Sequence, residues 1–371
     1  MKILITGDFV INIDYPIDNI NKEIISLFQN SDYNIVNLEA PVTNSNSKII
    51  KTGPHLKVNK VSTLAVLKVL EIDLVTLANN HVLDYDQQGV LDTLRFCQEN
   101  SIATVGAGKN KETASKVFYI ESAEGKIAII NMAENEWASA TEITAGANGM
   151  DLIDDAKQIQ EAKSKSDFVF VIVHGGHEFY NLPSPRMQKQ YRFYIDNGAD
   201  MVIGHHTHCI SGREIHNGKP IYYSLGNFLF TEPSTYNDWY TGLVLEIEIN
   251  EGKVTTSHFS VIQNKDNFGL SLLSGKAKEN IDKRFATYSS EIQDFATLKN
   301  SWEYFVKQRT KTYSSYWSPS TFVKNKYLKA VLNKTGILKP QKKASALYLN
   351  LLRCEAHRDA SKVFLNEILK K

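Results

Sequence analysis

Short apolar segments that end in polar clusters recur along residues 1–230, and they limit the folds that this chain can adopt. Continuous Val, Ile and Leu runs are typical of strands that are buried on both faces, as in α/β sheets. Helix-like stretches separate several of these runs, which predicts βαβ units and a layered α/β domain. The predicted strands are 2–8, 33–39, 74–81, 126–134, 168–178, 201–208 and 221–228, and the predicted helices are 61–71, 88–100, 154–165 and 187–197.

The sequence changes character after Phe230. Residues 241–263 predict an antiparallel hairpin that turns near Asn250–Glu251–Gly252. From about Lys276 onward the chain is Lys-rich, holds many aromatic residues and is helical in composition. We therefore predict two parts, an α/β domain over residues 1–270 and a mainly helical C-terminal appendage over residues 276–371.

Composition and charge exclude several classes of protein. The formal net charge of +1 gives no reason to expect a nucleic acid as partner. The three cysteines form no CxxC pair, which favours free thiols in a reducing compartment. MKILITGDFV begins a strand at once, and no window approaches the roughly 20 apolar residues of a membrane-spanning helix. We expect a cytoplasmic protein without a membrane segment.

The polar clusters at the strand ends predict a metal site. In open α/β sheets, functional sites form outside the carboxyl ends of the strands. Carboxylate and imidazole ligands without a thiolate suit Mn²⁺, Fe²⁺ or Zn²⁺, so we expect one or two divalent transition-metal ions. Two ions about 3.5–4 Å apart would suit phosphoryl transfer. The residues at these ends are Asp8, Asn37, Glu39, Asn79, Asn80, His81, His174, His177, Glu178, His205, His206 and His208.

Taken singly, most of these residues also have a structural explanation. Asp8 after Gly7 fits a turn or a helix cap, and His81 fits a hydrogen-bonded core histidine. His174 ends an apolar run, where an unpaired imidazole is unfavourable, so a metal explains it better. His206 and His208 would place both rings on one side of an extended segment, because strand side chains alternate with period two.

With these residues assembled, the chain resembles the CapA family of capsule or poly-γ-glutamate synthesis proteins, distant relatives of the calcineurin-like metallophosphoesterases. The resemblance covers residues 1 to about 265, with its motifs in order. It implies a four-layer α/β/β/α sandwich of metallophosphatase type with the metal site at one sheet edge. The motifs are GD (7–8), NLEAPVT (37–43), LANNHVLDYDQQGVLDTL (77–94), GAGKN (106–110), HGGHEF (174–179), GHHTH (204–208) and GKPIYYSLGNFLF (218–230).

The resemblance also implies roles for individual residues. His81 and Glu178 are the candidates for moving a proton, and Glu39 stands where the bridging acid would be. The chain departs from the metallophosphoesterase pattern Asp-x-His, because Val10 occupies the histidine position. The implied metal ligands are Asp8, Glu39, Asn80, His174, His206 and His208, with His206 favoured over His205.

Two functions are consistent with these residues. The first is a metal-dependent hydrolase of a phosphoester, or of an amide, linked to capsule or poly-γ-glutamate biosynthesis. The alternative is a non-catalytic capsule-assembly or polymer-binding component with a structural or vestigial metal site. The Lys-rich stretches 324–334 and 339–343 make an anionic polymer or a capsule-synthesis enzyme a candidate partner. Such charge runs are more often solvated helix faces.

Overall fold

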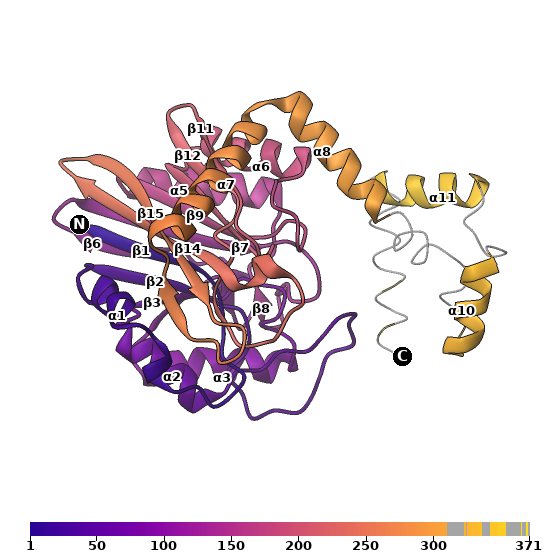
Figure 1. Ribbon diagram of the computed structural model, residues 1–371, viewed down its shortest axis with the longest axis horizontal. Helices are drawn as coiled ribbons and strands as arrows, with labels where there is room; N and C mark the ends of the chain where they lie inside the picture. The colour runs from indigo at the N-terminus through magenta and orange to yellow at the C-terminus, as the bar shows by residue number, and fades with distance from the viewer. Residues whose placement is uncertain (310–322, 324, 336–341, 354–364, 366–368, 370–371) are drawn as a thin grey trace. The chain divides into compact units, whose positions relative to one another are not determined.

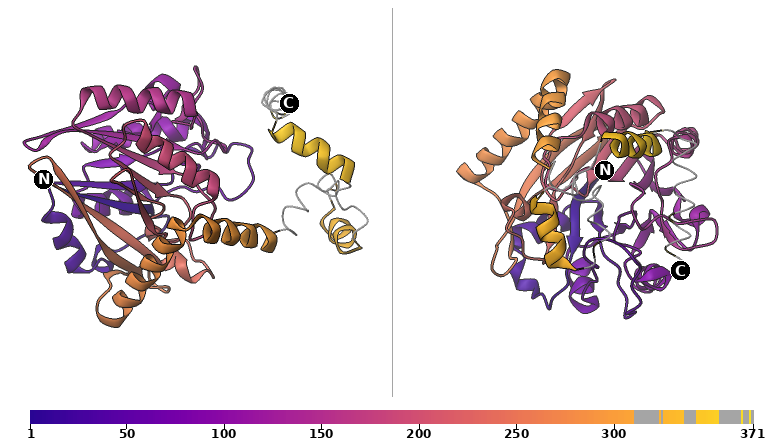
Figure 2. Two further views of the ribbon diagram at one scale, coloured as in Figure 1. Left: turned by 90° about the horizontal axis from the view of Figure 1, so that it is seen from above. Right: turned by 90° about the vertical axis from the view of Figure 1, so that its right-hand side faces the viewer.

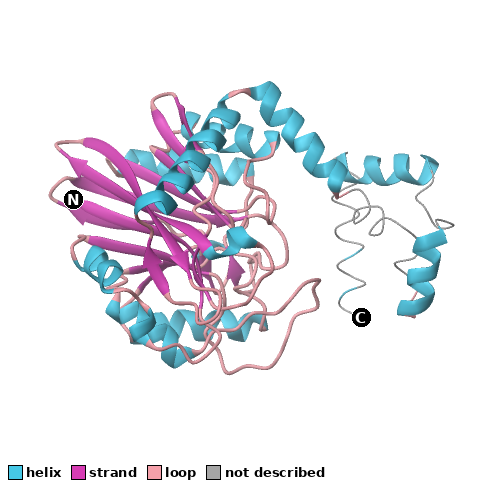
Figure 3. Ribbon diagram, viewed as in Figure 1, coloured by secondary structure: helices cyan, strands magenta, loops and turns pink. Residues whose placement is uncertain are grey.

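The computed structural model describes residues 1–309, 323, 325–335, 342–353, 365 and 369. The chain divides into two compact units, Met1–Lys299 and Asn300–Lys371. The first unit contains two large sheets that pack face to face, with helices on their outer faces (Figures 1 and 3). The predicted α/β class and its four α/β/β/α layers are confirmed.

The first sheet has the order β16-β15-β14-β1-β2-β3-β4, and β13 also pairs with β1. Strands β1 to β4 run parallel, whereas β14, β15 and β16 are antiparallel to their neighbours. The bounds are β1 Lys2–Val10, β2 Tyr33–Leu38, β3 Leu74–Thr76, β4 Ala103–Val105, β13 Asn227–Phe230, β14 Thr241–Asn250, β15 Lys253–Gln263 and β16 Leu270–Leu272.

The second sheet has the order β11-β12-β10-β9-β7-β6. Its central strands β7, β9, β10 and β12 are parallel, and antiparallel strands close both edges. The bounds are β6 Phe118–Ser122, β7 Gly125–Ala133, β9 Phe168–His174, β10 Met201–His205, β11 Arg213–His216 and β12 Lys219–Tyr222; a separate pair joins β5 Ala107–Gly108 to β8 Gly146–Ala147.

Alternating strand side chains fill two cores. Ile3 and Ile5 of β1 face the second sheet, whereas Leu4 between them faces the helices of the outer layer. Helices α1, α2 and α3 cover the first sheet, and α5 and α6 cover the second (Figure 2). The bounds are α1 Lys22–Gln29, α2 Lys60–Val69, α3 Asp86–Glu99, α4 Lys111–Ala114, α5 Leu152–Lys165 and α6 Pro185–Asp196, with short 3₁₀ turns at Ile17–Asn19 and Asn237–Tyr240.

The predicted hairpin is confirmed. In the β14–β15 pair, Asn250 stands opposite Lys253, so that Glu251 and Gly252 form a two-residue turn. Both have positive φ, +50° and +73°, as a type I′ hairpin turn requires.

The region after the hairpin contributes to both units. Helix α7, Gly275–Gln293, buries Ile281 and Phe285 in the core between the sheets. The further described helices are α8 Phe295–Gln308, α10 Lys326–Thr335 and α11 Lys342–Arg353. The predicted boundary between residues 270 and 276 stays a prediction. Of the Lys-rich stretches, residues 324 and 339–341 lie outside the described part of the chain.

Candidate metal centre

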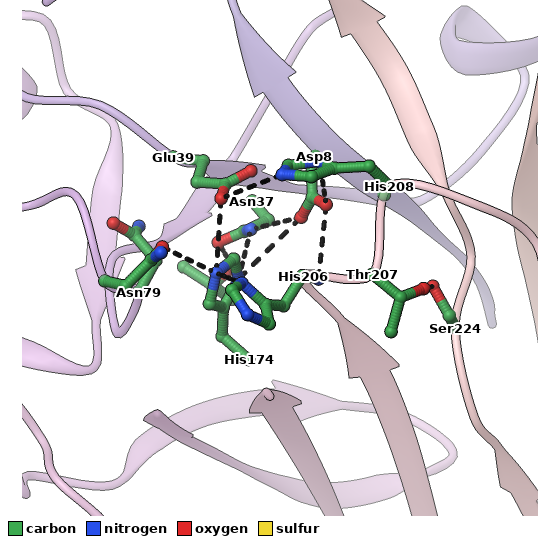
Figure 4. A network of polar contacts seen from close by, with 12 residues as sticks. Asp8, Asn37, Glu39, Asn79, His174, His206, Thr207, His208 and Ser224 are labelled. Atoms are coloured by element: carbon green, nitrogen blue, oxygen red, sulfur yellow. Dashed lines mark hydrogen bonds and ion pairs between the residues drawn. The ribbon is translucent and has the colours of Figure 1, made fainter. Parts of the chain in front are cut away.

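Polar side chains from both sheets meet at one edge of the sandwich (Figure 4). Strands β1 and β2 run parallel, as do β9 and β10, so that sites form beyond their carboxyl ends. Asp8 lies near the end of β1, Glu39 directly follows β2, and His174 is the last residue of β9. All three are buried.

Asp8 is turned toward the other site residues by an irregularity in β1. The pairing with β2 shifts register between Ile5 and Asp8. At Gly7 the chain touches the backbone of Gly226 so closely that a Cβ would stand 1.8 Å from the Gly226 oxygen. Only glycine fits at position 7, which gives the Gly-Asp pair a physical reason.

His206 and His208 reach the site in a different way from the predicted one. Strand β10 ends at His205, so the two histidines do not lie on an extended segment. Both have positive φ, +88° and +55°, which is unusual and unfavourable for residues other than glycine. The prediction of strand alternation was therefore wrong for these residues. The left-handed backbone itself turns the two rings into the site.

Three potential ligand atoms converge on Nε2 of His174, which is itself a fourth. Its Nε2 lies 3.0 Å from Asn80 Oδ1, 3.2 Å from Glu39 Oε1 and 3.0 Å from His206 Nδ1. Atoms bound about 2.0–2.1 Å from one ion stand about 3.0–3.4 Å from one another, by simple geometry. These distances are compatible with ligands that share a cation, although the two contacts of 3.0 Å are also hydrogen-bond distances.

A second group shares Glu39 with the first. His208 Nδ1 lies 3.3 Å from Asp8 Oδ2, and His208 Nε2 lies 3.8 Å from Glu39 Oε1. Ligand atoms of Asp8, Glu39 and His208 lie within 4.8 Å of one another, as do those of Glu39, His174 and His206. Glu39 is thus placed between two potential ion positions.

The hydrogen bonding of Glu39 supports a fit to divalent cations. Its side chain is fully buried, and neither carboxylate oxygen has a hydrogen-bond partner among the described residues. A buried carboxylate without hydrogen bonds is costly unless a cation balances it. The imidazole nitrogens and carboxylate oxygens around Glu39 match the donors that Mn²⁺, Fe²⁺ and Zn²⁺ accept.

Burial and charge act in opposite directions on the titration of these groups. Burial, reinforced by Asp8, raises the pKa of Glu39 well above its ordinary value. Burial lowers the pKa of His174 to about 4, despite the nearby Asp8. Burial also acts to lower the pKa of His208, but the carboxylates of Glu39 and Asp8 outweigh it and raise the pKa to about 10. Neutral His174 is the form that binds a metal.

Two asparagines support the ligands and were not assigned a role from the sequence. The amide nitrogen of Asn37 donates to Asp8 Oδ1 at 2.7 Å and lies 3.1 Å from His174 Nδ1. Asn227 Oδ1 lies 2.9 Å from His208 Nδ1. Both asparagines stand within motifs of the resemblance, Asn37 in NLEAPVT and Asn227 in SLGNF. Their contacts to residues far along the chain carry no signal in a single sequence.

The two candidates for moving a proton lie in different environments. His81 is buried beside Asn80, and its Nδ1 lies 2.7 Å from Asp84 Oδ2. Burial lowers the pKa of His81, although Asp84 opposes this effect. Glu178 lies exposed in the turn after β9, and its charge acts on Glu39 and His208.

Two further residues border the site. His205 is fully buried and belongs to neither ligand group, in agreement with the preference for His206. Glu136, which was not predicted, lies with Oε1 3.5 Å from His206 Nε2. It follows β7, in a segment for which the sequence carried no metal motif.

Comparisons with known proteins show which proteins this chain is similar to. Residues 2–232 match the family model described as "Bacterial capsule synthesis protein PGA_cap". The "PGA biosynthesis protein CapA" of Bacillus subtilis is 36% identical over 181 residues, 48% of this chain and 47% of that protein. The "Capsule biosynthesis protein CapA" of Bacillus anthracis is 30% identical over 227 residues, 59% of this chain and 55% of that protein. The chain thus spans about half the length of these relatives.

Solved structures share less with the chain. A structure titled as a novel phosphatase from Mycoplasma pneumoniae covers 72% of this chain and 95% of its own, with 14% identity and a TM-score of 0.44. A putative 5'-nucleotidase from Staphylococcus aureus covers 77% of this chain and 58% of its own, with 13% identity and a TM-score of 0.45. Within the part of the chain that the structure describes, no helix is both long and apolar enough to cross a membrane.

Proposed function

The chain belongs to the bacterial capsule synthesis protein family PGA_cap, and we propose that it is a metal-dependent hydrolase that cleaves a phosphoester in capsule or poly-γ-glutamate metabolism. The observation that supports this function best is the convergence of Glu39, His174 and His206 on one point, where the Glu39 carboxylate is buried and has no hydrogen bond from the described part of the chain. The names of the Bacillus relatives support the link to capsule or poly-γ-glutamate biosynthesis.

In this proposal each residue of the site has one task. Glu39, Asn80, His174 and His206 would hold one ion, and Asp8 and His208, together with Glu39, would hold a second. The bound ions supply Lewis acidity to a phosphoryl oxygen and acidity to water. The donor set favours Mn²⁺, Fe²⁺ or Zn²⁺. Asn37 and Asn227 hold Asp8 and His208 in orientation through the contacts described above.

His81 transfers the proton. Because its Nδ1 is engaged by the carboxylate of Asp84, the proton transfer falls to Nε2. Glu178 is the second candidate, and its exposed position suits exchange of the proton with solvent. An amide is the alternative substrate, since the same site chemistry serves hydrolysis of a polyamide such as poly-γ-glutamate.

One feature favours a non-catalytic alternative. Val10, which occupies the position of the metallophosphoesterase histidine, is fully buried and apolar, so that the Asp8–Glu39–His208 group has one imidazole fewer than that pattern. A site with a single tightly held ion would suit a capsule-assembly component that binds an anionic polymer or a capsule-synthesis enzyme.

The test is hydrolysis of an aryl phosphodiester by the purified protein with added Mn²⁺, together with elemental analysis. We expect bound metal and turnover in the wild type, both lost in the His206→Ala/His208→Ala double variant. His216→Ala is the control, because this partly exposed histidine pairs with Asp196 and is not one of the site residues. Bound metal without turnover on the phosphodiester or on polyglutamate would support the assembly role. Absence of metal from the wild type would contradict the hydrolase and the assignment of these residues to a metal site.

A further inference from the structure

A long segment without helix or strand connects β2 to α2 and lies close to His81. We call residues 44–57 of this segment the strap (Figure 1). Connections of this length without secondary structure are uncommon in compact domains and are usually functional when they are ordered. The contacts that hold the strap indicate which function it serves.

The strap carries a buried lysine. The side chain of Lys51 is only 2% exposed, although lysine is almost never buried unless it is paired. Its Nζ forms an ion pair with Oδ1 of Asp84, which is fully buried, and lies 3.2 Å from His81 Nδ1. Because the ammonium group is enclosed and already paired, Lys51 is not placed to bind a substrate anion itself.

Asp84 joins the strap to the imidazole of His81. Its Oδ2 accepts a hydrogen bond from Leu56 N at 2.7 Å and lies 2.7 Å from His81 Nδ1. Its backbone oxygen accepts from Ile49 N at 3.3 Å. One residue therefore fixes the strap on both sides of Lys51 and orients the ring of His81.

The charges determine how Asp84 presents its two oxygens. Lys51 engages Oδ1, which leaves Oδ2 directed at His81. Asp84 Oδ2, 2.7 Å from Nδ1, favours the proton on Nδ1 and outweighs the longer contact of Lys51 Nζ, 3.2 Å from the same nitrogen, so the imidazole is held mainly in one tautomer and one orientation. Without the ammonium group, the buried Oδ1 would lose its ion pair, and only the contacts of Oδ2 with Leu56 N and His81 Nδ1 would orient the carboxylate.

We propose that Lys51 is a positioning residue, which acts through Asp84 to hold the His81 imidazole with Nε2 available for proton transfer. The proposal rests on the proposed function for the chemistry that His81 performs. It extends the site to the strap, which contributes no residue to the metal ligands. A purely structural strap would stabilise the fold but would not determine the tautomer of His81.

The test uses the full-length protein and three variants. Lys51→Met removes the charge at similar size, and Lys51→Arg keeps the charge. His55→Ala is the matched control, because it removes the bond of His55 Nε2 to Ile49 O, 2.8 Å long, within the strap and leaves Asp84 untouched. Two quantities are measured: the ¹⁵N shifts of the His81 ring in protein labelled at histidine, and kcat and KM on an aryl phosphodiester with Mn²⁺.

We expect a single Nδ1–H tautomer for His81 in the wild type, in Lys51→Arg and in His55→Ala, and mixed tautomers in Lys51→Met. A misplaced proton-transfer group lowers kcat by about 10²-fold, so we expect a loss of about that size in Lys51→Met with KM nearly unchanged. Lys51→Arg should recover most of kcat. If Lys51→Met does not fold, Lys51→Gln removes the charge while keeping a polar side chain beside Asp84, and it tests the same losses with Asp84 intact.

Two results would overturn the inference. One is an unchanged His81 tautomer and kcat in Lys51→Met, and the other is an equal loss in His55→Ala, which would assign the effect to loosening of the strap. If the wild type has no turnover, the proposed function fails, and the ¹⁵N shifts alone then decide whether Lys51 positions His81.

Discussion

Replacing Glu39 by glutamine should change stability in opposite directions with and without metal. In the metal-free protein, the Glu39 carboxylate is buried without hydrogen bonds, so its charge is unfavourable. Removing that charge should raise the free energy of unfolding at neutral pH by about 1–2 kcal/mol, the difference between a buried carboxylate and a buried amide that both lack hydrogen bonds. With metal present, the same change removes the ligand that both candidate ion positions share.

The pH dependence follows from the raised pKa of Glu39. The folded protein retains the Glu39 proton to higher pH than the unfolded chain, whose carboxyl titrates near 4.5. In the metal-free protein, the contribution of Glu39 to the free energy of unfolding therefore decreases as the pH rises from 4.5 to the higher pKa of the folded state. Glu39→Gln lacks this decrease, so the difference between its free energy of unfolding and that of the wild type should grow with pH across that window.

The assay is thermal unfolding at pH 7.5 in EDTA and in Mn²⁺. At a metal concentration 100 times its Kd, binding would raise the free energy of unfolding by about 2.7 kcal/mol, which corresponds to a rise of about 5 °C in Tm for a unit of this size. Glu39→Gln should lose that shift while its Tm in EDTA equals or exceeds the wild-type value.

Glu214→Gln is the contrasting control for Glu39→Gln. Glu214 is also buried, but it is paired with Arg192 and accepts a hydrogen bond from Tyr223 OH. Neutralising Glu214 leaves the half-buried Arg192 without its partner and weakens the bond from Tyr223 OH, so this variant should be less stable in both conditions, by about 1–3 kcal/mol. If Glu39→Gln lowers the metal-free Tm as much as Glu214→Gln does, the reasoning on the Glu39 charge is refuted.

Three further predictions concern the supports of the site and the division of the chain. Asn37→Ala should weaken Mn²⁺ binding about 10–100-fold in calorimetry, because its amide orients both Asp8 and His174; unchanged affinity would contradict this role. Gly7→Ala should lower the free energy of unfolding in urea by more than about 3 kcal/mol, since its Cβ would overlap the Gly226 oxygen. An unfolding midpoint equal to that of the wild type would show that the backbone can move away from the clash. A chain ending at Lys299 should unfold cooperatively. A chain ending at Ser274 also loses the burial of Ile281 and Phe285, about 1.5–3 kcal/mol each, and should be less stable. Equal stability of the two chains would contradict the packing of α7.

The fold could be predicted largely from the chain, because it follows from local patterns. Apolar runs of strand length marked the buried strands, and the parallel arrangement brought Asp8, Glu39 and His174 to one edge. The hairpin turn was predicted correctly since Glu251–Gly252 is a local signal. These features depend on residues close together in sequence, which a single chain shows directly.

The remainder of the site could not be predicted from local patterns. His206 and His208 were identified correctly, but their left-handed backbone depends on the loop that follows β10 and not on strand alternation. Lys51 and Asp84 are 33 positions apart, and their pairing appears only when the strap folds over His81. Helix α7 is polar in composition, yet it buries Ile281 in the first unit, which composition did not indicate.

The most direct measurement of the central claim is anomalous diffraction from crystals of the protein soaked in Mn²⁺. We expect one anomalous peak bounded by Glu39, Asn80, His174 and His206. At a higher Mn²⁺ concentration, we expect a second peak beside Asp8 and His208. A map without a peak at Glu39, or with Mn²⁺ bound only elsewhere on the protein, would contradict the assignment of these residues to a metal centre.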